Sequence, residues 1–187
     1  MSCPLRRYPW LKRLIPGPVN ALLLAAVVWL WFYPPASITT TFKPAPAITV
    51  HLLDGRELPL TRLRGQVVLV NFWATWCPWC IKEMPAIASF NRDWQARGFT
   101  VVSLSLDDNP ATAREWLRQH HYPFTAGMAD SMTQQAFGGI RQIPSSFVID
   151  RNGQLREQIN GQVTYGRLEN LVKPLLLAPE GATAGKS

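Results

Sequence analysis

The sequence predicts an α/β sandwich in which helices flank a central mixed β-sheet. Two observations carry this prediction. Strand-like apolar runs alternate with helix-like segments along most of the chain, a pattern that produces parallel strands. The last two strand-like runs are joined across Asn152-Gly153, a dipeptide that favours a hairpin, so part of the sheet is expected to be antiparallel. With 187 residues the chain has room for one such domain and a tail.

The net charge of +7 does not indicate a nucleic-acid partner. Four cations, Arg6, Arg7, Lys12 and Arg13, precede the first long apolar run, and the other arginines are scattered along the chain. Basic nucleic-acid-binding proteins instead gather Lys and Arg on one face, together with a recognisable reading motif. We therefore expect solvated surface charge and no binding of nucleic acid.

An uncharged apolar segment follows these cations and predicts a membrane span. Residues 16–33 would extend about 27 Å as a helix, which is close to the thickness of the hydrocarbon layer. Trp29, Trp31 and Tyr33 gather at the far end, where aromatic rings favour the headgroup region. The positive-inside rule then places residues 1–15 in the cytoplasm and the following domain outside. We expect an uncleaved single-pass anchor, and a cleaved signal peptide is the alternative.

Composition also sets the expected domain bounds. Residues 34–47 are rich in Pro, Ala and Thr, which predicts an extended linker between membrane and domain. Residues 48–177 carry the alternating elements and form the predicted domain. Residues 178–187 are mostly small and polar, so we expect a flexible tail there.

Within the domain each element follows from its periodicity and its punctuation. A first hairpin turns at Asp54-Gly55, and the next strand is apolar throughout, as buried strands are. A long helix ends before Gly98, and Pro110 suits the first turn of the next helix. The expected strands are Ile48–Leu53, Arg56–Leu60, Gln66–Trp73, Phe99–Leu106, Phe124–Ala126, Ser145–Ile149 and Gln154–Asn160. The expected helices are Pro78–Arg97, Ala111–His120, Ser131–Phe137 and Gly166–Leu177.

Cys77 and Cys80 form a C-x-x-C pair where the buried strand meets the long helix, whereas Cys3 stands apart. A sulfur at the start of a helix faces unpaired N–H groups and the positive end of the helix dipole, which stabilise a thiolate. Because the thiolate is the nucleophile of disulfide exchange, we expect Cys77 to attack and Cys80 to resolve the mixed disulfide. Pro78 suits the first helical turn, since its missing N–H would be unpaired there.

Three tryptophans surround the cysteine pair in sequence. Trp76 and Trp79 bracket Cys77, and we predict that they shield the sulfur and dock a partner protein. Ordinary packing is the alternative for each of them, and it is the interpretation that we favour for Trp73.

Other uses of a C-x-x-C pair fit less well. Haem attachment needs His after the second cysteine, and Ile81 stands there. Structural zinc needs four ligands, yet His51, His120 and His121 show no ligand spacing with the pair. Inert buried cysteines would leave the position at a helix start unexplained. We expect no metal, and no cofactor other than a redox-active disulfide of the pair.

Two separate segments resemble thioredoxins. Val67–Pro85 is similar to their active-site strand and helix, including Pro85, where such helices kink. Gly139–Pro144 resembles the loop whose cis proline faces the disulfide. Over residues 46–177 the combination most resembles the membrane-anchored, extracytoplasmic TlpA/ResA/CcmG (DsbE)-like family.

This resemblance implies a thioredoxin-like fold, with an N-terminal β-hairpin and a helix–strand insertion at residues 107–130, behind an N-terminal transmembrane helix. It also implies a cis peptide bond before Pro144. Ile143 would then present its backbone to a substrate chain in extended pairing. The implied location is the bacterial inner (cytoplasmic) membrane, with the catalytic domain facing the periplasm or the exterior.

Glu83 matches a further feature of the family. Thioredoxin has a buried Asp where Asn71 stands, whereas the TlpA/ResA-like pattern places a Glu three residues after the second cysteine. Because residues i and i+3 share a helix face, Glu83 can lie near Cys80 and carry a proton to or from its thiol. The alternative is a solvated Glu83 paired with Lys82 or a nearby Arg.

The motif itself does not tell reduction from oxidation. The resemblance implies a reductase of protein disulfides, kept reduced by a membrane electron donor of DsbD/CcdA type, with apocytochrome c as the common substrate. Ser145 stands where CcmG-like chains carry an acidic residue after the cis proline. A disulfide oxidase or isomerase is the alternative among enzymes, and a peroxidase is disfavoured because it needs no C-x-x-C partner. A copper-handling thiol module, with Met84 or Met128 as a further ligand, is the alternative outside enzymes.

Overall fold

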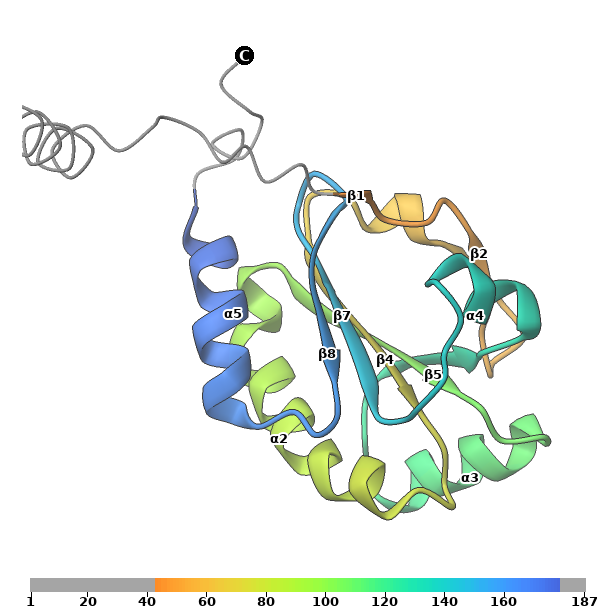
Figure 1. Ribbon diagram of the computed structural model, residues 1–187. Helices are drawn as coiled ribbons and strands as arrows, with labels where there is room; N and C mark the ends of the chain where they lie inside the picture. Colours follow the sequence, from red (N-terminus) through yellow and green to blue (C-terminus); the bar gives the residue numbers. More distant parts are fainter. Residues whose placement is uncertain (1–42, 179–187) are drawn as a thin grey trace, which may run out of the picture. The chain divides into compact units, whose positions relative to one another are not determined.

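Strand β4 (Val67–Trp73) lies inside the sheet, and all its side chains are buried. The structure is a computed structural model that describes residues 43–178. β4 pairs in parallel with β5 (Phe99–Ser105) on one side and antiparallel with β7 (Ser145–Ile149) on the other. The unbroken apolar run predicts a strand covered on both faces, and β4 is such a strand. The predicted mixed sheet is confirmed (Figure 1).

The outer strands extend the sheet in the same two senses. β6 (Thr125–Met128) adds in parallel to β5, and β8 (Gln154–Asn160) adds antiparallel to β7 as the predicted hairpin. The strand order among the described residues is β1-β8-β7-β4-β5-β6.

The first strand corrects the predicted linker. β1 (Lys43–Pro44) lies within residues 34–47 and pairs antiparallel with the start of β8. The backbone N–H of Ala45 extends this contact by donating to the carbonyl oxygen of Gly153 at 2.9 Å. The folded domain therefore includes residues 43–47. The linker prediction missed this pairing because a strand at a sheet edge can be held by backbone groups, which a Pro- and Ala-rich sequence does not reveal.

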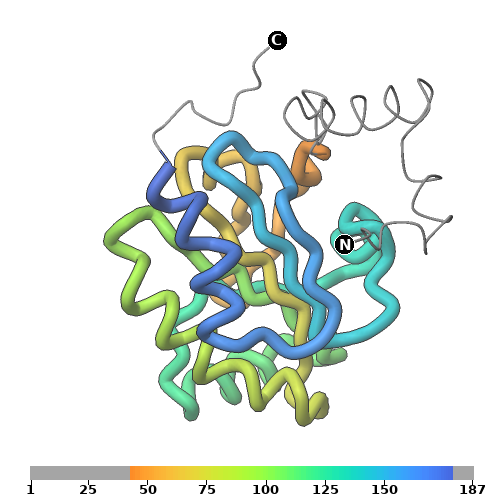
Figure 2. Tube along the Cα trace, turned by 60° about the vertical axis from the view of Figure 1, so that its left-hand side comes forward, coloured from red at the N-terminus to blue at the C-terminus, as the bar shows by residue number. Residues whose placement is uncertain are grey.

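Two helices cover one face of the sheet. α2 (Pro78–Trp94) and α5 (Tyr165–Leu177) lie side by side in both views (Figures 1 and 2). The core beneath them takes alternate residues of β4 and β5, because side chains along a strand point to opposite faces in turn. Its largest fully buried members are Phe90, Phe99, Leu69, Ile87, Ile159 and Leu168.

The opposite face is covered by shorter elements. They are the hairpin of β2 (Thr49–His51) and β3 (Glu57–Pro59), the 3-10 helix η2 (Leu60–Leu63) and helix α4 (Ser131–Ala136). The hairpin across Asp54-Gly55 is confirmed, although its strands are shorter than expected.

Gly127 lets this hairpin approach the edge of β6. Leu52 bridges to Gly127, and the N–H of Leu53 donates to the carbonyl oxygen of Ala126 at 2.8 Å. A Cβ atom at Gly127 would lie 2.7 Å from the carbonyl oxygen of His51 and from a methyl of Val50. Glycine is therefore required here by the close approach of a neighbouring backbone.

The helix ends follow local signals. α2 runs into the 3-10 helix η3 (Gln95–Arg97) and stops at Gly98, whose φ of 87° is in the left-handed region. α3 (Pro110–Gln119) begins one residue before the predicted start, because the Asn109 side chain accepts a hydrogen bond from the N–H of Ala111.

The part of the chain described by the structure has no helix long and apolar enough to cross a bilayer. The predicted cytoplasmic segment 1–15, the predicted span 16–33, the linker up to residue 42 and the tail from residue 179 lie outside the described residues. They remain predictions from the sequence.

Candidate functional site

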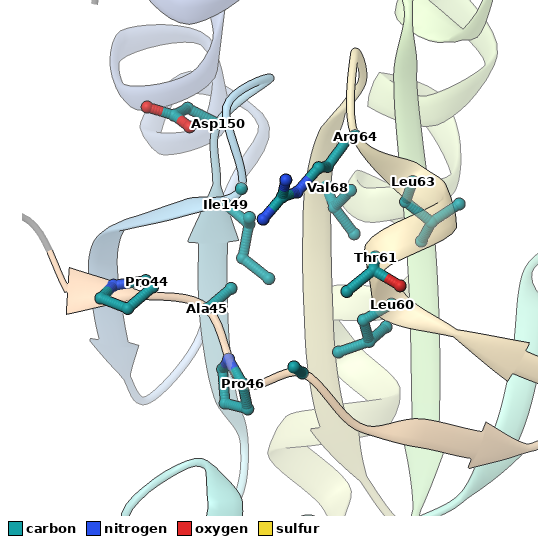
Figure 3. Close-up of a pocket in the computed structure, with 12 residues that line it drawn as sticks. Pro44, Ala45, Pro46, Leu60, Thr61, Leu63, Arg64, Val68, Ile149 and Asp150 are labelled. Atoms are coloured by element: carbon teal, nitrogen blue, oxygen red, sulfur yellow. The ribbon is translucent and has the colours of Figure 1, made fainter. Parts of the chain in front are cut away.

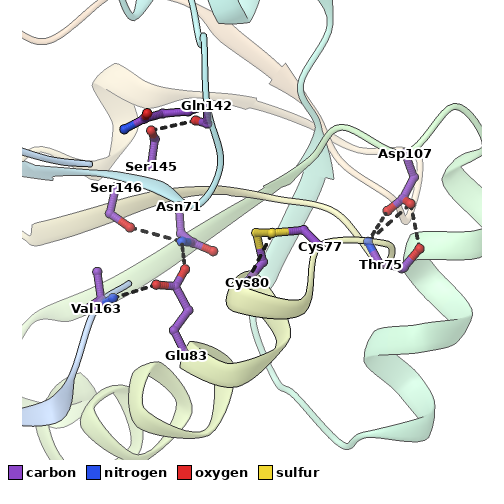
Figure 4. The surroundings of a disulfide bond; sticks show 10 residues. All are labelled: Asn71, Thr75, Cys77, Cys80, Glu83, Asp107, Gln142, Ser145, Ser146 and Val163. Atoms are coloured by element: carbon purple, nitrogen blue, oxygen red, sulfur yellow. Dashed lines mark hydrogen bonds between the residues drawn. A yellow bond between two sulfur atoms is a disulfide. The ribbon is translucent and has the colours of Figure 1, made fainter. Parts of the chain in front are cut away.

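The two cysteines meet where β4 ends and α2 begins. Cys77 is the N-cap of α2, and Pro78 occupies the first helical position. The backbone N–H of Cys80 donates to Sγ of Cys77 at 3.2 Å, so the first sulfur receives a donor at the helix start, as the sequence predicts. Cys77 and Cys80 are joined by a disulfide (Figure 4). The Cα atoms of the pair are 5.3 Å apart.

The two sulfurs are not equally buried. Cys77 keeps 5% of its surface exposed, whereas Cys80 keeps none. Beside Cys77, Trp76 is 65% exposed and Trp79 is 59% exposed, so neither of these rings is a core side chain. Large exposed aromatic rings next to a reactive group are typical of a protein-binding surface. Trp73 is fully buried, and the packing role that we favoured for it is confirmed.

The loop after α4 brings a proline to the disulfide end of the sheet. The Ile143–Pro144 peptide bond is cis, as the resemblance implies. Pro144 is buried, and half-buried Ile143 packs against the apolar cluster that contains both cysteines. The hydroxyl of Ser145 donates to the carbonyl oxygen of Gln142 at 2.8 Å and closes this loop.

Glu83 is fully buried, which excludes the solvated alternative. Its Oε1 accepts a hydrogen bond from Nδ2 of Asn71 at 2.8 Å, and its Oε2 accepts one from the N–H of Val163 at 2.7 Å. Lys82, the partner considered in the alternative, lies instead over the ring of Trp79 at 5.1 Å from its centroid. Burial raises the pKa of Glu83 to about 7, and the hydrogen bonds from Val163 and Asn71 oppose this rise.

The sequence did not predict Asn71 as a site residue. It showed only that Asn71 replaces the buried Asp of thioredoxin. Asn71 is fully buried on β4, and its Nδ2 also donates to the hydroxyl oxygen of Ser146 on β7 at 3.0 Å. Its Oδ1 has no hydrogen-bond partner among the described residues. We call Asn71, Glu83, Ser146 and the N–H of Val163 the Glu83 cluster. The available signal was a single amide in an otherwise apolar strand, since a buried polar group needs a partner.

A second polar cluster holds the loop before Cys77. The Asp107 carboxylate is buried and accepts hydrogen bonds from the hydroxyl of Thr75 and from the hydroxyl of Ser105, each at 2.7 Å. It also accepts from the backbone N–H of Thr75 at 3.2 Å. We call Thr75, Ser105 and Asp107 the Asp107 cluster. The sequence indicated only a turn at Asp107. Ser105 is two residues away, but Thr75 is 32 positions away and is brought to Asp107 by the pairing of β4 with β5.

Residues weighed for metal binding have other surroundings. Among residues 43–178, no group of three His, Cys, Asp or Glu side chains is arranged to hold a metal ion. Met84 is fully buried in the cluster that contains the two cysteines, and Met128 packs against the same cluster.

An apolar pocket lies away from this chemistry. It has a volume of about 400 Å³ and lies between the segment after β1 and the start of β4 (Figure 3). Val68 and Ile149 line it, and they are paired at the end of the β4–β7 ladder opposite to the cysteines. The pocket holds no sulfur, so it is separate from the redox site.

A disulfide capping a helix at the end of a central strand, with a buried carboxyl on the same helix, can exchange with thiols from outside. The fold and the site together define a thiol–disulfide oxidoreductase with a thioredoxin-like fold.

Comparison with known proteins assigns the chain more closely. The Redoxin family model matches residues 41–173, and the chain belongs to this family. The thiol-disulfide oxidoreductase ResA of Bacillus thuringiensis (strain Al Hakam) is 31% identical over 133 residues, which cover 71% of this chain and 77% of ResA. The thiol:disulfide interchange protein HelX of Rhodobacter capsulatus is 33% identical over 138 residues, covering 72% and 76% of the two chains.

A solved structure agrees with the fold. The crystal structure of a thiol:disulfide interchange protein from Chlorobium tepidum TLS superposes with a TM-score of 0.68 and 31% identity. The match covers 73% of this chain and 98% of that protein. The resemblance to ResA-like oxidoreductases that the sequence carries is therefore confirmed.

Proposed function

We propose that this thiol–disulfide oxidoreductase reduces protein disulfides outside the cytoplasm, while residues 16–33 anchor it in a bacterial cytoplasmic membrane. The observation that carries the exchange mechanism is the difference between the sulfurs. Cys77 keeps a little exposure between two exposed tryptophans, whereas Cys80 is fully buried on the helix face of Glu83. A foreign disulfide can reach only the first sulfur, so Cys77 is the attacking group.

The exchange consists of two displacements. The Cys77 thiolate attacks one sulfur of the substrate disulfide, forms a mixed disulfide and releases the other substrate sulfur as a thiolate. Cys80 then attacks Sγ of Cys77, which releases the second substrate thiolate and forms the Cys77–Cys80 disulfide. Two electrons pass to the substrate, and an external dithiol must restore the reduced pair.

Glu83 takes the proton in the second displacement. Cys80 must lose its proton to become a nucleophile, and a buried thiol does not release a proton directly to water. A carboxyl with a pKa of about 7 is matched to this transfer at neutral pH, since proton donors and acceptors work best near the ambient pH. The Glu83 carboxylate accepts the proton as Cys80 attacks and returns it when the pair is reduced again.

Substrate docking is assigned to the surface around Cys77. Trp76 and Trp79 supply exposed apolar area, while Pro78 leaves the start of α2 without one N–H. On the other side of the disulfide, the backbone of Ile143 before Pro144 pairs with an extended segment of the substrate chain. A surface of this kind suits an unfolded or extended cysteine-containing protein.

Partners and location extend the same proposal. The substrates are protein thiols and disulfides, with apocytochrome c as the candidate to test first. A membrane dithiol carrier of DsbD/CcdA type supplies the electrons, and no cofactor beyond the Cys77–Cys80 disulfide takes part. ResA and HelX, which are named for thiol–disulfide chemistry, support the reaction class.

Trapping tests the order of attack. The experiment uses the full chain in detergent with Cys3→Ser as the background, so that only the pair can react. Cys80→Ser should accumulate a mixed disulfide between Cys77 and disulfide-containing membrane partners. Cys77→Ser should lose insulin reduction and trap nothing. If the Cys77→Ser chain forms adducts on Cys80 and the Cys80→Ser chain forms none on Cys77, the order of attack is the reverse of the one proposed.

Potential and topology test the rest of the proposal. Equilibration with glutathione should give a potential near thioredoxin's, about −270 mV, and a value near DsbA's, about −120 mV, would make the protein an oxidant. In spheroplasts a membrane-impermeant maleimide should label reduced Cys77 before lysis and Cys3 only after it. Tight stoichiometric Cu(I) binding without insulin turnover would favour the copper module instead.

A further inference from the structure

The two oxygens of the Glu83 carboxyl have different partners, and this difference decides which oxygen holds a proton. Oε2 accepts from the backbone N–H of Val163 at 2.7 Å. A backbone N–H can only donate, so Oε2 must remain an acceptor in both protonation states. Because the carbonyl oxygen of a protonated carboxyl is a better acceptor than its hydroxyl oxygen, the proton on Glu83 belongs on Oε1.

Oε1 faces a second donor in the observed arrangement. Nδ2 of Asn71 donates to it at 2.8 Å, which suits a carboxylate. A protonated Oε1 would place its O–H against this N–H, and two donors facing each other cannot form a hydrogen bond. The other end of the Asn71 amide, Oδ1, is buried and has no hydrogen-bond partner among the described residues.

A half-turn of the Asn71 amide removes this conflict. The turn exchanges Nδ2 with Oδ1, so that Oδ1 accepts from the O–H of Glu83. Ser146 tolerates the exchange, because its hydroxyl accepts from Nδ2 at 3.0 Å in one orientation and donates to Oδ1 in the other. One amide atom lacks a partner in either orientation, so the turn does not add an unpaired buried group.

We propose that Asn71 is a positioning residue whose amide turns over with the proton on Glu83, so that the buried carboxyl keeps its hydrogen bond both as carboxylate and as acid. The proposal rests on the proton-carrying role proposed for Glu83. The groups that donate to this carboxyl are Asn71 from β4 and the N–H of Val163, with Ser146 of β7 behind Asn71. Cys80 precedes Glu83 by three residues on α2. No charged side chain among residues 43–178 forms a hydrogen bond or ion pair with the Glu83 carboxyl in the structure.

The test follows Glu83 and Asn71 separately in the oxidised full chain in detergent. The carboxyl carbon of Glu83, assigned by its loss in Glu83→Gln, reports the proton by NMR between pH 5 and pH 9. The side-chain amide of Asn71, assigned by its loss in Asn71→Leu, should shift with the same midpoint. An Asn71 amide signal that stays constant while Glu83 titrates would overturn the proposal. The variants serve only to assign the two signals, and the titration itself is followed in the parent chain.

Variants sharpen the result. Asn71→Leu removes the hydrogen bond to Glu83 in both protonation states, and the bond to the carboxylate is the stronger of the two. The Glu83 midpoint should therefore rise by about one pH unit, a tenfold change in proton affinity. Ser146→Ala is the matched control, since it removes a group that contacts Asn71 and not Glu83, and its midpoint shift should be smaller. Equal shifts in the two variants would contradict a direct role for Asn71.

Turnover separates this proposal from the proposed function. If Asn71 follows the Glu83 proton while Glu83→Gln reduces insulin as fast as the parent chain, the proton-carrying role fails and the amide turn stands. If Glu83→Gln is slow while the Asn71 amide does not respond, the amide turn fails and the role of Glu83 stands.

Discussion

The Glu83 cluster and the Asp107 cluster lie on the two sides of the Cys77–Cys80 disulfide, and each contains one buried carboxyl (Figure 4). The Glu83 carboxyl is fully buried and receives one amide donor and one backbone donor. The Asp107 carboxylate receives two hydroxyls and a backbone N–H, all from residues that adjoin the active-site loop.

The difference shows how one functional group serves two purposes. A carboxyl with few donors in a buried place holds a proton near neutral pH, because burial disfavours its charged form. A carboxyl surrounded by donors instead ties down the groups that donate to it. In this chain Glu83 is suited to exchange a proton, and Asp107 is suited to hold the loop from which Cys77 projects.

The largest expected effect is a pH-dependent gain in stability for Glu83→Gln. The pKa of Glu83 is raised from 4.5 to about 7 in the folded chain, so its contribution to stability is complete below pH 4.5 and is lost as the pH rises through about 7. The loss is on the order of 3 kcal/mol at pH 8, and Gln cannot ionise, so the variant should escape it. Urea unfolding of the oxidised chain at pH 5 and pH 8 measures this difference.

The control for this prediction is Glu157→Gln, at an exposed position of β8. It should follow the parent chain at both pH values. If the parent and Glu83→Gln lose the same free energy of unfolding between pH 5 and pH 8, the pKa of Glu83 is not raised in the folded chain.

Asp107→Ala should cost about 2 kcal/mol in free energy of unfolding, because the hydroxyls of Thr75 and Ser105 and one backbone N–H lose their acceptor. Urea unfolding gives the loss, and NMR of the Glu83 carboxyl gives the second readout. The Glu83 midpoint should stay near 7, since the two clusters share no residue. A midpoint that moves by a full unit would mean that the clusters act as one.

Thr75→Val should have a smaller effect of the same kind. It removes the hydroxyl that donates to Asp107 at 2.7 Å and keeps the backbone N–H, so we expect a loss of about 1 kcal/mol. Thr61→Val, at an exposed position, is the matched control and should change stability by less than about 0.5 kcal/mol. If Thr75→Val and Thr61→Val lose the same free energy of unfolding, the hydrogen bond from Thr75 to Asp107 does not stabilise the loop.

The smallest expected effect is that of Lys82→Met. Lys82 lies over the exposed ring of Trp79 and makes no hydrogen bond or ion pair with Glu83 within the described part of the chain. Its loss should change stability by about 0.5 kcal/mol and leave the Glu83 midpoint unchanged. A shift of the Glu83 NMR titration midpoint in either direction would indicate a Lys82–Glu83 ion pair, which the burial of Glu83 argues against.

Much of the fold was predictable because its signals are local. The apolar run of β4, the glycine turns of both hairpins and Pro110 at the start of α3 each depend on residues close in sequence. β1 was missed because its pairing with β8 uses backbone groups more than 100 positions apart, and no side-chain pattern records such a contact.

The sequence by itself determined the α/β order, the position of Cys77 at a helix start and the presence of a carboxyl one turn after Cys80. Only the tertiary structure decided that this carboxyl is buried, that Asn71 and Val163 supply its hydrogen bonds, and that Asp107 holds the preceding loop. The physical reason is that desolvation and hydrogen bonding depend on which distant segments the sheet brings together. A sequence shows which groups can carry a proton, and packing sets the pH at which they do so.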